Sequence, residues 1–270
     1  MISDREIFQL LDTNFLTTGH ISIKNGLVNC SGTVKLLKKM DIMPLKFERV
    51  DGAFNCSNSQ LTSLSGAPQT VGDDFLCSQN QLTSLTGAPK SVGGNFYCGD
   101  NQLTSLSDAP QLVGGDFYCY RNRLTSLSGA PQSVNGDFYC HDNQITSLSG
   151  APKSVGGDFE CGNNQLSSLV GAPQYVAESF YCTENQFTSL AGAPRYVGKD
   201  FRVTYNKNLA LLPLLKINGC QRVIFSDTEN VTIKTDLSKL LNRYLGTGTR
   251  GMLSCAMEMI KAGYGSNARL

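Results

Sequence analysis

A cysteine returns every 21 residues along most of this chain, and that period constrains the fold more than any other feature. The repeated cysteines are Cys56, Cys77, Cys98, Cys119, Cys140, Cys161 and Cys182. A proline keeps the same spacing from Pro68 to Pro194. A fixed period of this size is typical of a solenoid, in which each repeat packs only on its neighbours. Such a fold offers a long surface, and we expect its function to lie on that surface.

A single repeat, residues 113–127, predicts a short strand followed by a tight turn. Phe117 and Cys119 alternate with Tyr118 and Tyr120, which is the two-residue period of a strand with one inward and one outward face. Asn122 follows, and its side-chain amide can satisfy the backbone groups of a turn.

The rest of the repeat predicts the return path. Leu124 and Leu127 are expected to point into the core. Pro131 in the segment 128–131 favours an extended, unpaired path and forbids a long helix. The pair Gly114 and Gly115 allows the sharp bend into the next strand.

The repeat F-Y-C-x-x-N-x-L-T-S-L is similar to the L-x-L-x-x-N-x-L core of leucine-rich repeats, with Phe and Cys in place of the usual strand leucines. The short return ending in A-P resembles the short bacterial subtype, and the match covers roughly residues 50–212. The resemblance implies an α/β fold: a right-handed leucine-rich-repeat solenoid with about eight or nine parallel strands on its concave face. Extended or turn returns would form the convex face, and helical caps would cover the ends.

We expect three parts: an N-terminal helical cap over residues 1–22, the solenoid over 23–212, and a C-terminal cap with two helices over 213–270. At the N-terminus, Ser3 and Glu6 form a capping-box pattern that predicts a helix over residues 4–13. Residues 28–30 look like a strand, and residues 35–49 look like an irregular repeat with an insertion, because 26 residues separate Cys30 from Cys56.

At the C-terminus, residues 222–225 and 231–233 look like short strands. A helix is expected to begin at Thr235 or Asp236 and to end at Gly246. A second helix is expected from about residue 250 to 262. Its predicted inward residues are Met252, Leu253, Ala256, Met259 and Ile260.

The composition argues against nucleic-acid binding, a membrane span and a secretory peptide. Charged residues make up 17% of the chain and the net charge is +1, whereas a nucleic-acid-binding protein usually has a basic face. No apolar run is long enough for a membrane span. The polar start of the chain lacks the apolar stretch of a secretory peptide, so a cytoplasmic location and reduced cysteines are expected.

The cysteine column predicts core packing rather than metal or redox chemistry, and we expect no cofactor. Each cysteine shares the inward face with a phenylalanine, and free Cys behaves as a small buried hydrophobe. There is no C-x-x-C pair, G-x-S-x-G, P-loop or H-E-x-x-H motif, so no enzyme is expected. Because Cys140 points inward and His141 outward, a Cys–His dyad is disfavoured.

The outward strand positions hold the candidate site. With strands about 4.8 Å apart, Tyr97, Tyr118 and Tyr139 are expected to form a continuous aromatic strip. Exposed tyrosines are enriched in binding hot spots. The predicted partner-binding residues are Tyr97, Tyr118, Tyr120, Arg121, Tyr139, His141, Asp142, Glu160 and Tyr181.

Two structural alternatives remain open. Stacked tyrosines also stabilise a sheet, and duplication of one repeat would copy a tyrosine without selection for binding. A second column of like charges could be held by backbone N–H groups of the adjacent glycine turns or could bind cations such as calcium. This column is Asp74, Asn95, Asp116, Asp137, Asp158, Ser179 and Asp200.

The sequence therefore predicts a non-enzymatic scaffold that recognises a partner protein through the concave face. The near-identical repeats and the C-terminal segment 263–270 resemble repeat proteins of large tailed bacteriophages. That resemblance implies a protein acting in the host cytosol, where blocking a host defence component would be a natural role. The alternatives are a small-molecule or glycan binder on the concave face and a self-assembling structural protein. The oligomeric state is not predicted.

Overall fold

The computed structural model describes residues 2–204, 209–226, 231–245 and 247–268. The repeats form a β-solenoid of parallel strands, with one coil of the chain for each 21-residue period. The chain divides into two compact units. Unit 1 comprises residues up to 124 together with 128–136, and unit 2 comprises 125–127 together with the residues from 137 onward.

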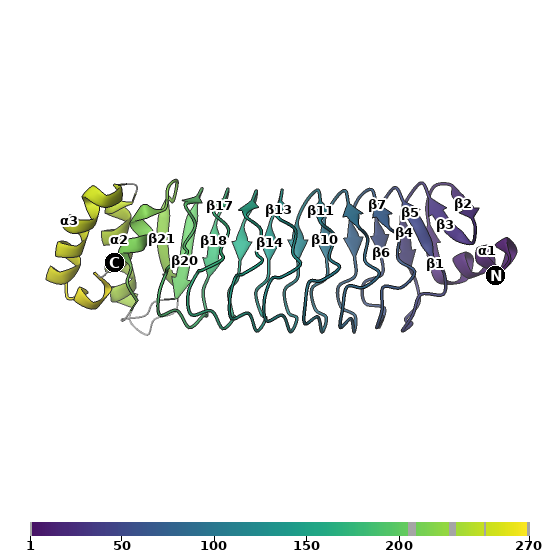
Figure 1. Ribbon diagram of the computed structural model, residues 1–270, viewed down its shortest axis with the longest axis horizontal. Coiled ribbons are helices and arrows are strands. Elements are labelled where there is room, and N and C mark those ends of the chain that lie inside the picture. The colour runs from purple at the N-terminus through teal and green to yellow at the C-terminus, as the bar shows by residue number, and fades with distance from the viewer. Residues whose placement is uncertain (1, 205–208, 227–230, 246, 269–270) are drawn as a thin grey trace. The chain divides into compact units, whose positions relative to one another are not determined.

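The main sheet of unit 1 contains the strands that begin with the repeated phenylalanine and two strands that precede them in the chain (Figure 1). Its strands, in order, are β1 (Phe15–Thr17), β4 (Val34–Leu36), β6 (Phe54–Asn55), β8 (Phe75–Leu76), β10 (Phe96–Tyr97) and β12 (Phe117–Tyr118). β1 pairs with β4 in an antiparallel manner, and the other pairs are parallel.

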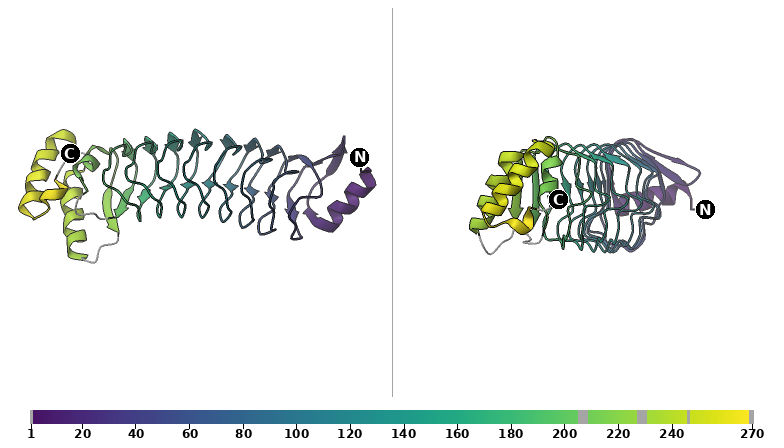
Figure 2. Two further views of the ribbon diagram at one scale, coloured as in Figure 1. Left: turned by 60° about the horizontal axis from the view of Figure 1, so that its bottom comes forward. Right: turned by 60° about the vertical axis from the view of Figure 1, so that its left-hand side comes forward.

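A second sheet lies on the return path of the coils in unit 1, and the sequence did not predict it. Its strands are β2 (Ile21–Lys24), β3 (Leu27–Cys30), β5 (Phe47–Val50), β7 (Thr70–Val71), β9 (Ser91–Val92) and β11 (Leu112–Val113). β13 (Ser133–Val134) follows in the same unit. Figure 2 shows the two rows of strands on separate walls of the coils. The return path, which was predicted to be extended and unpaired, therefore contains short paired strands.

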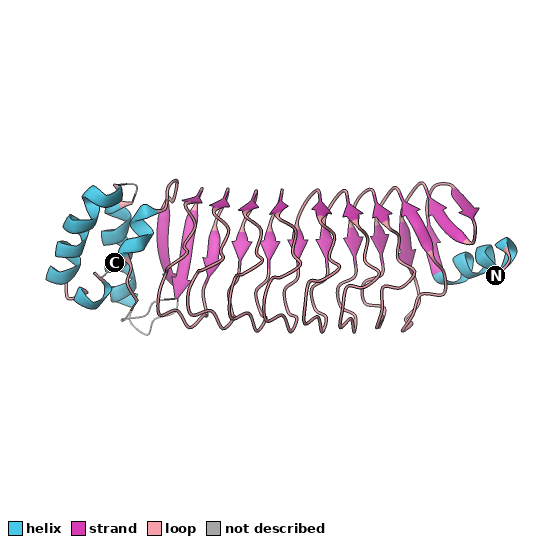
Figure 3. Cartoon of the chain, viewed as in Figure 1, coloured by secondary structure: helices cyan, strands magenta, loops and turns pink. Residues whose placement is uncertain are grey.

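Unit 2 repeats this two-walled plan (Figure 3). Its main strands are β14 (Phe138–Tyr139), β16 (Phe159–Glu160), β18 (Phe180–Cys182), β20 (Asp200–Thr204) and β21 (Arg222–Ser226), all parallel. Its second sheet contains β15 (Ser154–Val155), β17 (Tyr175–Val176) and β19 (Tyr196–Val197). The strand predicted over residues 222–225 is confirmed by β21.

Identical inward side chains stack on one another inside each unit. In unit 2, the ring of Phe159 lies 5.6 Å from that of Phe138 and 5.1 Å from that of Phe180, and all three are fully buried. The repeated cysteines are also buried, and burial raises the pKa of the Cys56 thiol to about 12. These thiols are therefore protonated core groups, as the sequence predicted.

The repeated asparagine ties neighbouring coils together. In unit 1 the Asn122 side-chain oxygen accepts a hydrogen bond from the backbone N–H of Leu103 at 2.9 Å. Its nitrogen donates to the backbone oxygens of Cys98 and Cys119 at 3.0 and 3.1 Å. The side chain thus satisfies buried backbone groups of two successive coils, which is why the position recurs.

Glycines allow the coils of the second wall to approach closely. A Cβ added to Gly93 would lie 2.1 Å from the backbone oxygen of Gly72, and one added to Gly114 would lie 2.0 Å from that of Gly93. No side chain fits at these distances. Close coil packing, rather than a special φ angle, therefore requires glycine here.

The N-terminal helix is confirmed, but the strand assignment beside it is corrected. α1 (Asp4–Asn14) begins with the predicted capping box, in which Ser3 and Glu6 bond reciprocally. β3 belongs to the second sheet and not to the main sheet, because it pairs with β5. The main strand of this coil is β4, whose Val34 pairs with Phe54. Residues 35–49 therefore include a main and a second-sheet strand rather than an insertion.

The C-terminal part contains α2 (Val231–Tyr244), α3 (Gly248–Lys261) and two short 3-10 helices, η1 (Leu212–Lys216) and η2 (Gly265–Asn267). Residues 231–233 are helical and not a strand, so α2 begins earlier than predicted. The predicted stop at Gly246 lies outside the described residues. In α3, Met252 and Met259 are buried as predicted, but Leu253 and Ile260 are exposed. None of the described helices combines the length and apolar character needed to cross a bilayer.

Candidate functional site

Each main strand contributes one outward side chain to an in-register row within its unit, which is termed the outer row. In unit 1 the outer row is Leu16, Lys35, Asn55, Leu76, Tyr97 and Tyr118. In unit 2 it is Tyr139, Glu160, Tyr181, Arg202 and Ile224.

Three tyrosine rings gather at one end of the outer row of unit 1. The rings of Tyr97 and Tyr118 lie 4.9 Å apart, close to the strand spacing, and the ring of Tyr120 lies 6.3 Å from that of Tyr118. Tyr120 occupies the space over Gly99, where an added Cβ would come within 2.9 Å of the ring. The rings are half-buried, so each still presents part of its surface to solvent.

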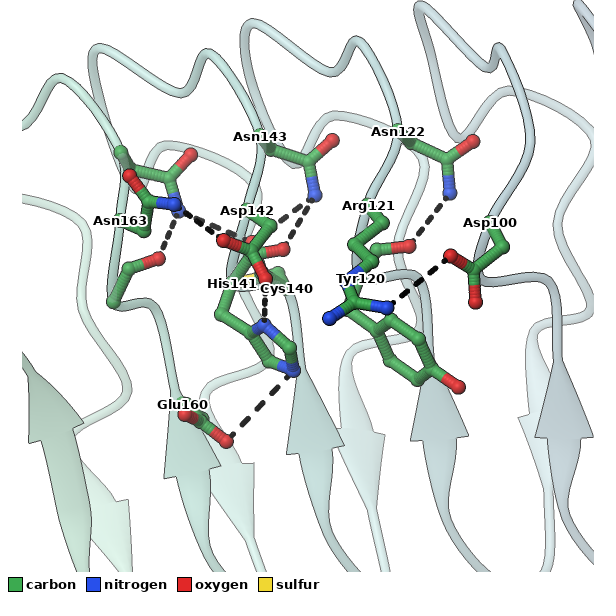
Figure 4. Close-up of polar contacts among 12 residues, drawn as sticks. Asp100, Tyr120, Arg121, Asn122, Cys140, His141, Asp142, Asn143, Glu160 and Asn163 are labelled. Carbon is green, nitrogen blue, oxygen red and sulfur yellow. Dashed lines mark hydrogen bonds and ion pairs between the residues drawn. The ribbon is translucent and has the colours of Figure 1, made fainter.

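Arg121 extends from the turn beside this aromatic cluster. Its guanidinium lies 3.7 Å from the carboxylate of Asp100 and its side chain is 64% exposed (Figure 4). Its φ is 49°, in the left-handed region that disfavours an arginine. The equivalent residues also have a positive φ: Asn58, Gln79, Asp100, Asp142, Asn163 and Glu184.

A polar cluster occupies the corresponding part of unit 2. The Nδ1 atom of His141 lies 2.8 Å from Asp142, and its Nε2 atom lies 4.0 Å from Glu160 (Figure 4). The imidazole ring is 6.2 Å from the ring of Tyr139. Asp142 also accepts a hydrogen bond from the side chain of Asn163. Four of the predicted site residues therefore come together here: one aromatic ring, one imidazole and two carboxylates.

Burial and neighbouring carboxylates shape the chemistry of this cluster. Burial raises the pKa of Glu160, and Asp142 and Asp158 raise it further, whereas His141 lowers it. Burial, with help from Asp137, also raises the pKa of the Tyr139 hydroxyl. Tyr139 is therefore a neutral hydrogen-bonding group at physiological pH. Cys140, the residue before His141, is fully buried on the inward face.

Tyr181 lies next to Glu160 in the outer row and is covered by an arginine that the sequence analysis did not select. The guanidinium carbon of Arg202 lies 5.3 Å from the centre of the Tyr181 ring, within the range of a cation–π contact. Arg202 also lies 3.7 Å from the buried carboxylate of Asp200, which binds Arg222 at 2.8 Å. Its place in the same column as the tyrosines was the signal that could have identified it.

The acidic column is a hydrogen-bond ladder between coils. A side-chain oxygen of Asp74 accepts the backbone N–H of Asn95, and that of Asn95 accepts the N–H of Asp116, both at 2.7 Å. Asp137 and Asp158 do the same in unit 2. The donors come from the next coil and not from the adjacent glycine turns. Among the described residues no group of His, Cys, Asp or Glu is arranged to hold a metal ion.

The same ladder fixes the tyrosines of unit 1. The Tyr118 hydroxyl donates to Asp116 at 2.8 Å, and the Asn95 side chain donates to the Tyr97 hydroxyl at 3.1 Å. The rings are thereby held in place before any partner arrives, which lowers the entropy cost of binding. The strip predicted over Tyr97, Tyr118 and Tyr139 stays a prediction as a whole, because Tyr139 belongs to unit 2.

Comparison with known proteins adds no further constraint. No protein-family model matches the chain, and neither a curated protein nor a solved structure does.

Proposed function

We propose that this chain is a non-enzymatic scaffold that binds a partner protein through the outer row and the turns beside it. Three half-buried tyrosine rings beside the exposed Arg121 support this proposal more than any other observation. Tyrosine and arginine are among the residues most enriched in binding hot spots, because they combine large contact area with hydrogen bonding. Hydrogen bonds to Asn95 and Asp116 hold the rings of Tyr97 and Tyr118 in place, as a pre-organised binding surface requires.

The variety of the outer row also favours recognition over simple sheet stabilisation. In unit 2, neighbouring strands place Glu160, Tyr181 and Arg202 side by side. An acidic, an aromatic and a basic group in register can match a partner with its own pattern of charges. Stacking alone would be served by one residue type repeated on every strand, as on the inward face.

A protein partner fits this surface better than a small ligand. Two adjoining hollows of unit 1, of 460 and 530 Å³, share Gln111 and Leu112 as lining residues and lie on the side of the second sheet. Neither is lined by a residue of the tyrosine cluster. A broad surface with aromatic and charged groups suits a macromolecule.

The proposal extends to the type of repeat and to the origin of the protein. The strand–asparagine–leucine repeat supports a leucine-rich-repeat type, with the difference that the return carries a second sheet. The repeat resemblance further supports a bacteriophage protein that acts on a host defence component in the bacterial cytosol.

Affinity purification with the full chain, followed by mass spectrometry and a binding assay with the purified partner, tests the proposal. The key variant is Tyr97→Ser with Tyr118→Ser. The matched control is Tyr175→Ser with Tyr196→Ser, which removes another stacked pair, 4.8 Å apart, from the second sheet of unit 2. We expect the first variant to weaken binding by at least about tenfold and the control to leave it unchanged.

Circular dichroism confirms that each variant is folded. Equal binding by the wild type and the first variant would refute the role of the outer row. Loss of binding in the control alone would move the site to the second sheet. If the first variant unfolds, the single substitution Arg121→Ser tests the same surface without removing a stacked ring.

A further inference from the structure

The outward face of α3 carries an apolar stripe that nothing in the described structure covers. Leu253, Met257 and Ile260 are 71%, 52% and 60% exposed. Their spacing of four and three residues places them on one side of the helix. Lys261 is exposed too and lies four residues after Met257, at the end of the same face. Contiguous exposed apolar groups of this kind usually mark an interaction surface.

The outward face of α1 has a complementary character. Phe8 is 46% exposed, whereas its neighbours Ile7 and Leu11 are turned toward the core and buried. Asp4 and Asp12 lie four residues before and after Phe8, so they flank it on the same face, and both are exposed. This face therefore presents an aromatic ring between two carboxylates.

We propose that copies of this chain associate head to tail, with the α3 face of one copy packed against the α1 face of the next. Phe8 would lie on the stripe of Leu253, Met257 and Ile260, and Lys261 would approach a carboxylate of α1. The contact joins apolar surface to apolar surface and positive charge to negative charge.

Charge favours a second copy as the occupant and disfavours pairing of like ends. The described charged side chains of α2 and α3 are Lys239, Arg243 and Lys261 against Glu258 alone, whereas α1 contains one Arg and three Asp or Glu. Two C-terminal faces repel each other, as do two N-terminal faces, while unlike faces attract. Because each copy has one face of each kind, the contact is heterologous and leads to rings or to open chains of more than two copies.

The positions of the two helices within their units leave the outer row accessible. α1 packs beside β1, which is the edge strand of the main sheet in unit 1. α3 packs on α2 and η1, and α2 packs on β21, the last main strand of unit 2. Neither face includes a residue of the outer row, so head-to-tail association and partner binding can be tested separately.

Sedimentation velocity of the full chain over a range of protein and salt concentrations tests the association. We expect the mass of the wild type to rise with protein concentration and to fall with added salt. Phe8→Asp and Leu253→Asp should each weaken association by at least about tenfold, because each places a charge at the centre of the apolar contact. Leu112→Asp alters an exposed leucine of the second sheet and should behave as the wild type.

A mixture of the two end variants gives the sharpest result. The Phe8→Asp chain keeps its α3 face and the Leu253→Asp chain keeps its α1 face, so the mixture should form a one-to-one complex and nothing larger. A wild type that stays monomeric at every concentration would overturn the proposal. Continued self-association of either variant alone would also overturn it, since it would mean that like ends pair.

A charge exchange checks the proposed partners without touching the apolar residues. Asp12→Lys and Lys261→Glu should each weaken association, and the chain that carries both should recover it. Circular dichroism confirms folding for all variants. If the double variant associates no better than either single variant, the proposed pairing of the two faces is wrong.

Discussion

The inward and outward side chains of the same strands differ in how much they vary. On β16, Phe159 faces the core and Glu160 faces away from it. The inward position holds phenylalanine on every main strand from β6 to β20. The outward position on those strands holds asparagine, leucine, tyrosine, glutamate or arginine. The inward face of the sheet therefore keeps one residue type, whereas the residue type on the outward face varies from strand to strand.

The difference has a physical origin. In-register parallel strands place identical positions about 4.8 Å apart, so an inward side chain must match the volume that its neighbours in the column leave, and repeating one residue type achieves this. An outward side chain has solvent beside it and tolerates any residue with strand propensity. Variation on the inward face would cost stability, whereas variation on the outward face is free to serve recognition.

The largest expected effect comes from separate alanine substitutions at two adjacent residues of β16, one inward and one outward. Phe159→Ala should lower the free energy of unfolding by about 3–5 kcal/mol, because it removes a fully buried ring stacked on two others. Glu160→Ala should change it by less than about 0.5 kcal/mol. Urea denaturation followed by circular dichroism measures both. Similar losses for the two variants would remove the distinction between the faces.

A second neighbouring pair sharpens the comparison at the turns. The Asn164 side chain is buried, accepts the N–H of Ile145 at 2.9 Å and donates to three backbone oxygens. Asn164→Ala should cost about 2–3 kcal/mol, since buried backbone groups of two coils lose their partner. Asn163→Gly should cost less than about 1 kcal/mol, because glycine adopts the φ of 49° without strain and the hydrogen bond lost to Asp142 is exposed. Urea denaturation of both variants measures these changes. An equal loss of unfolding free energy at the two positions would contradict the role of the buried Asn164 amide.

Sequence reasoning succeeded where the repeat multiplies a weak local signal. Phe117, Cys119 and Asn122 each belong to a column of near-identical residues, so one alternation pattern was confirmed on strand after strand. The capping box at Ser3 gave an equally local signal for α1. The outward columns followed from the same alternation, and with them the candidate residues.

The sequence-based predictions failed where tertiary packing, rather than local sequence, determines the structure. The strands of the second sheet are mostly two residues long, as in Ser91–Val92, and so short a segment has no alternation to detect. Residues 231–233 have the β-branched composition of a strand, yet they form the first turn of a helix that packs against β21. The hydrogen bond from Tyr118 to Asp116 depends on side-chain geometry that spacing alone does not give.

The smallest expected effect separates stability from recognition at a single residue. Arg121 has a φ of 49°, a conformation that asparagine adopts more readily than arginine. Its ion pair with Asp100 is exposed and contributes little. Arg121→Asn should therefore raise the free energy of unfolding by about 0.5–1 kcal/mol, while binding of the partner becomes weaker because a guanidinium is lost beside the tyrosine cluster.

Denaturation and the partner-binding assay on this one variant test both statements. A more stable variant with weaker binding would show that the arginine is kept at a cost to the fold, which is the behaviour expected of a recognition residue. A variant that binds as well as the wild type would place Arg121 outside the binding surface. A loss of stability would mean that its contacts outweigh the unfavourable backbone, and the outer face would then resemble the inner one at this position.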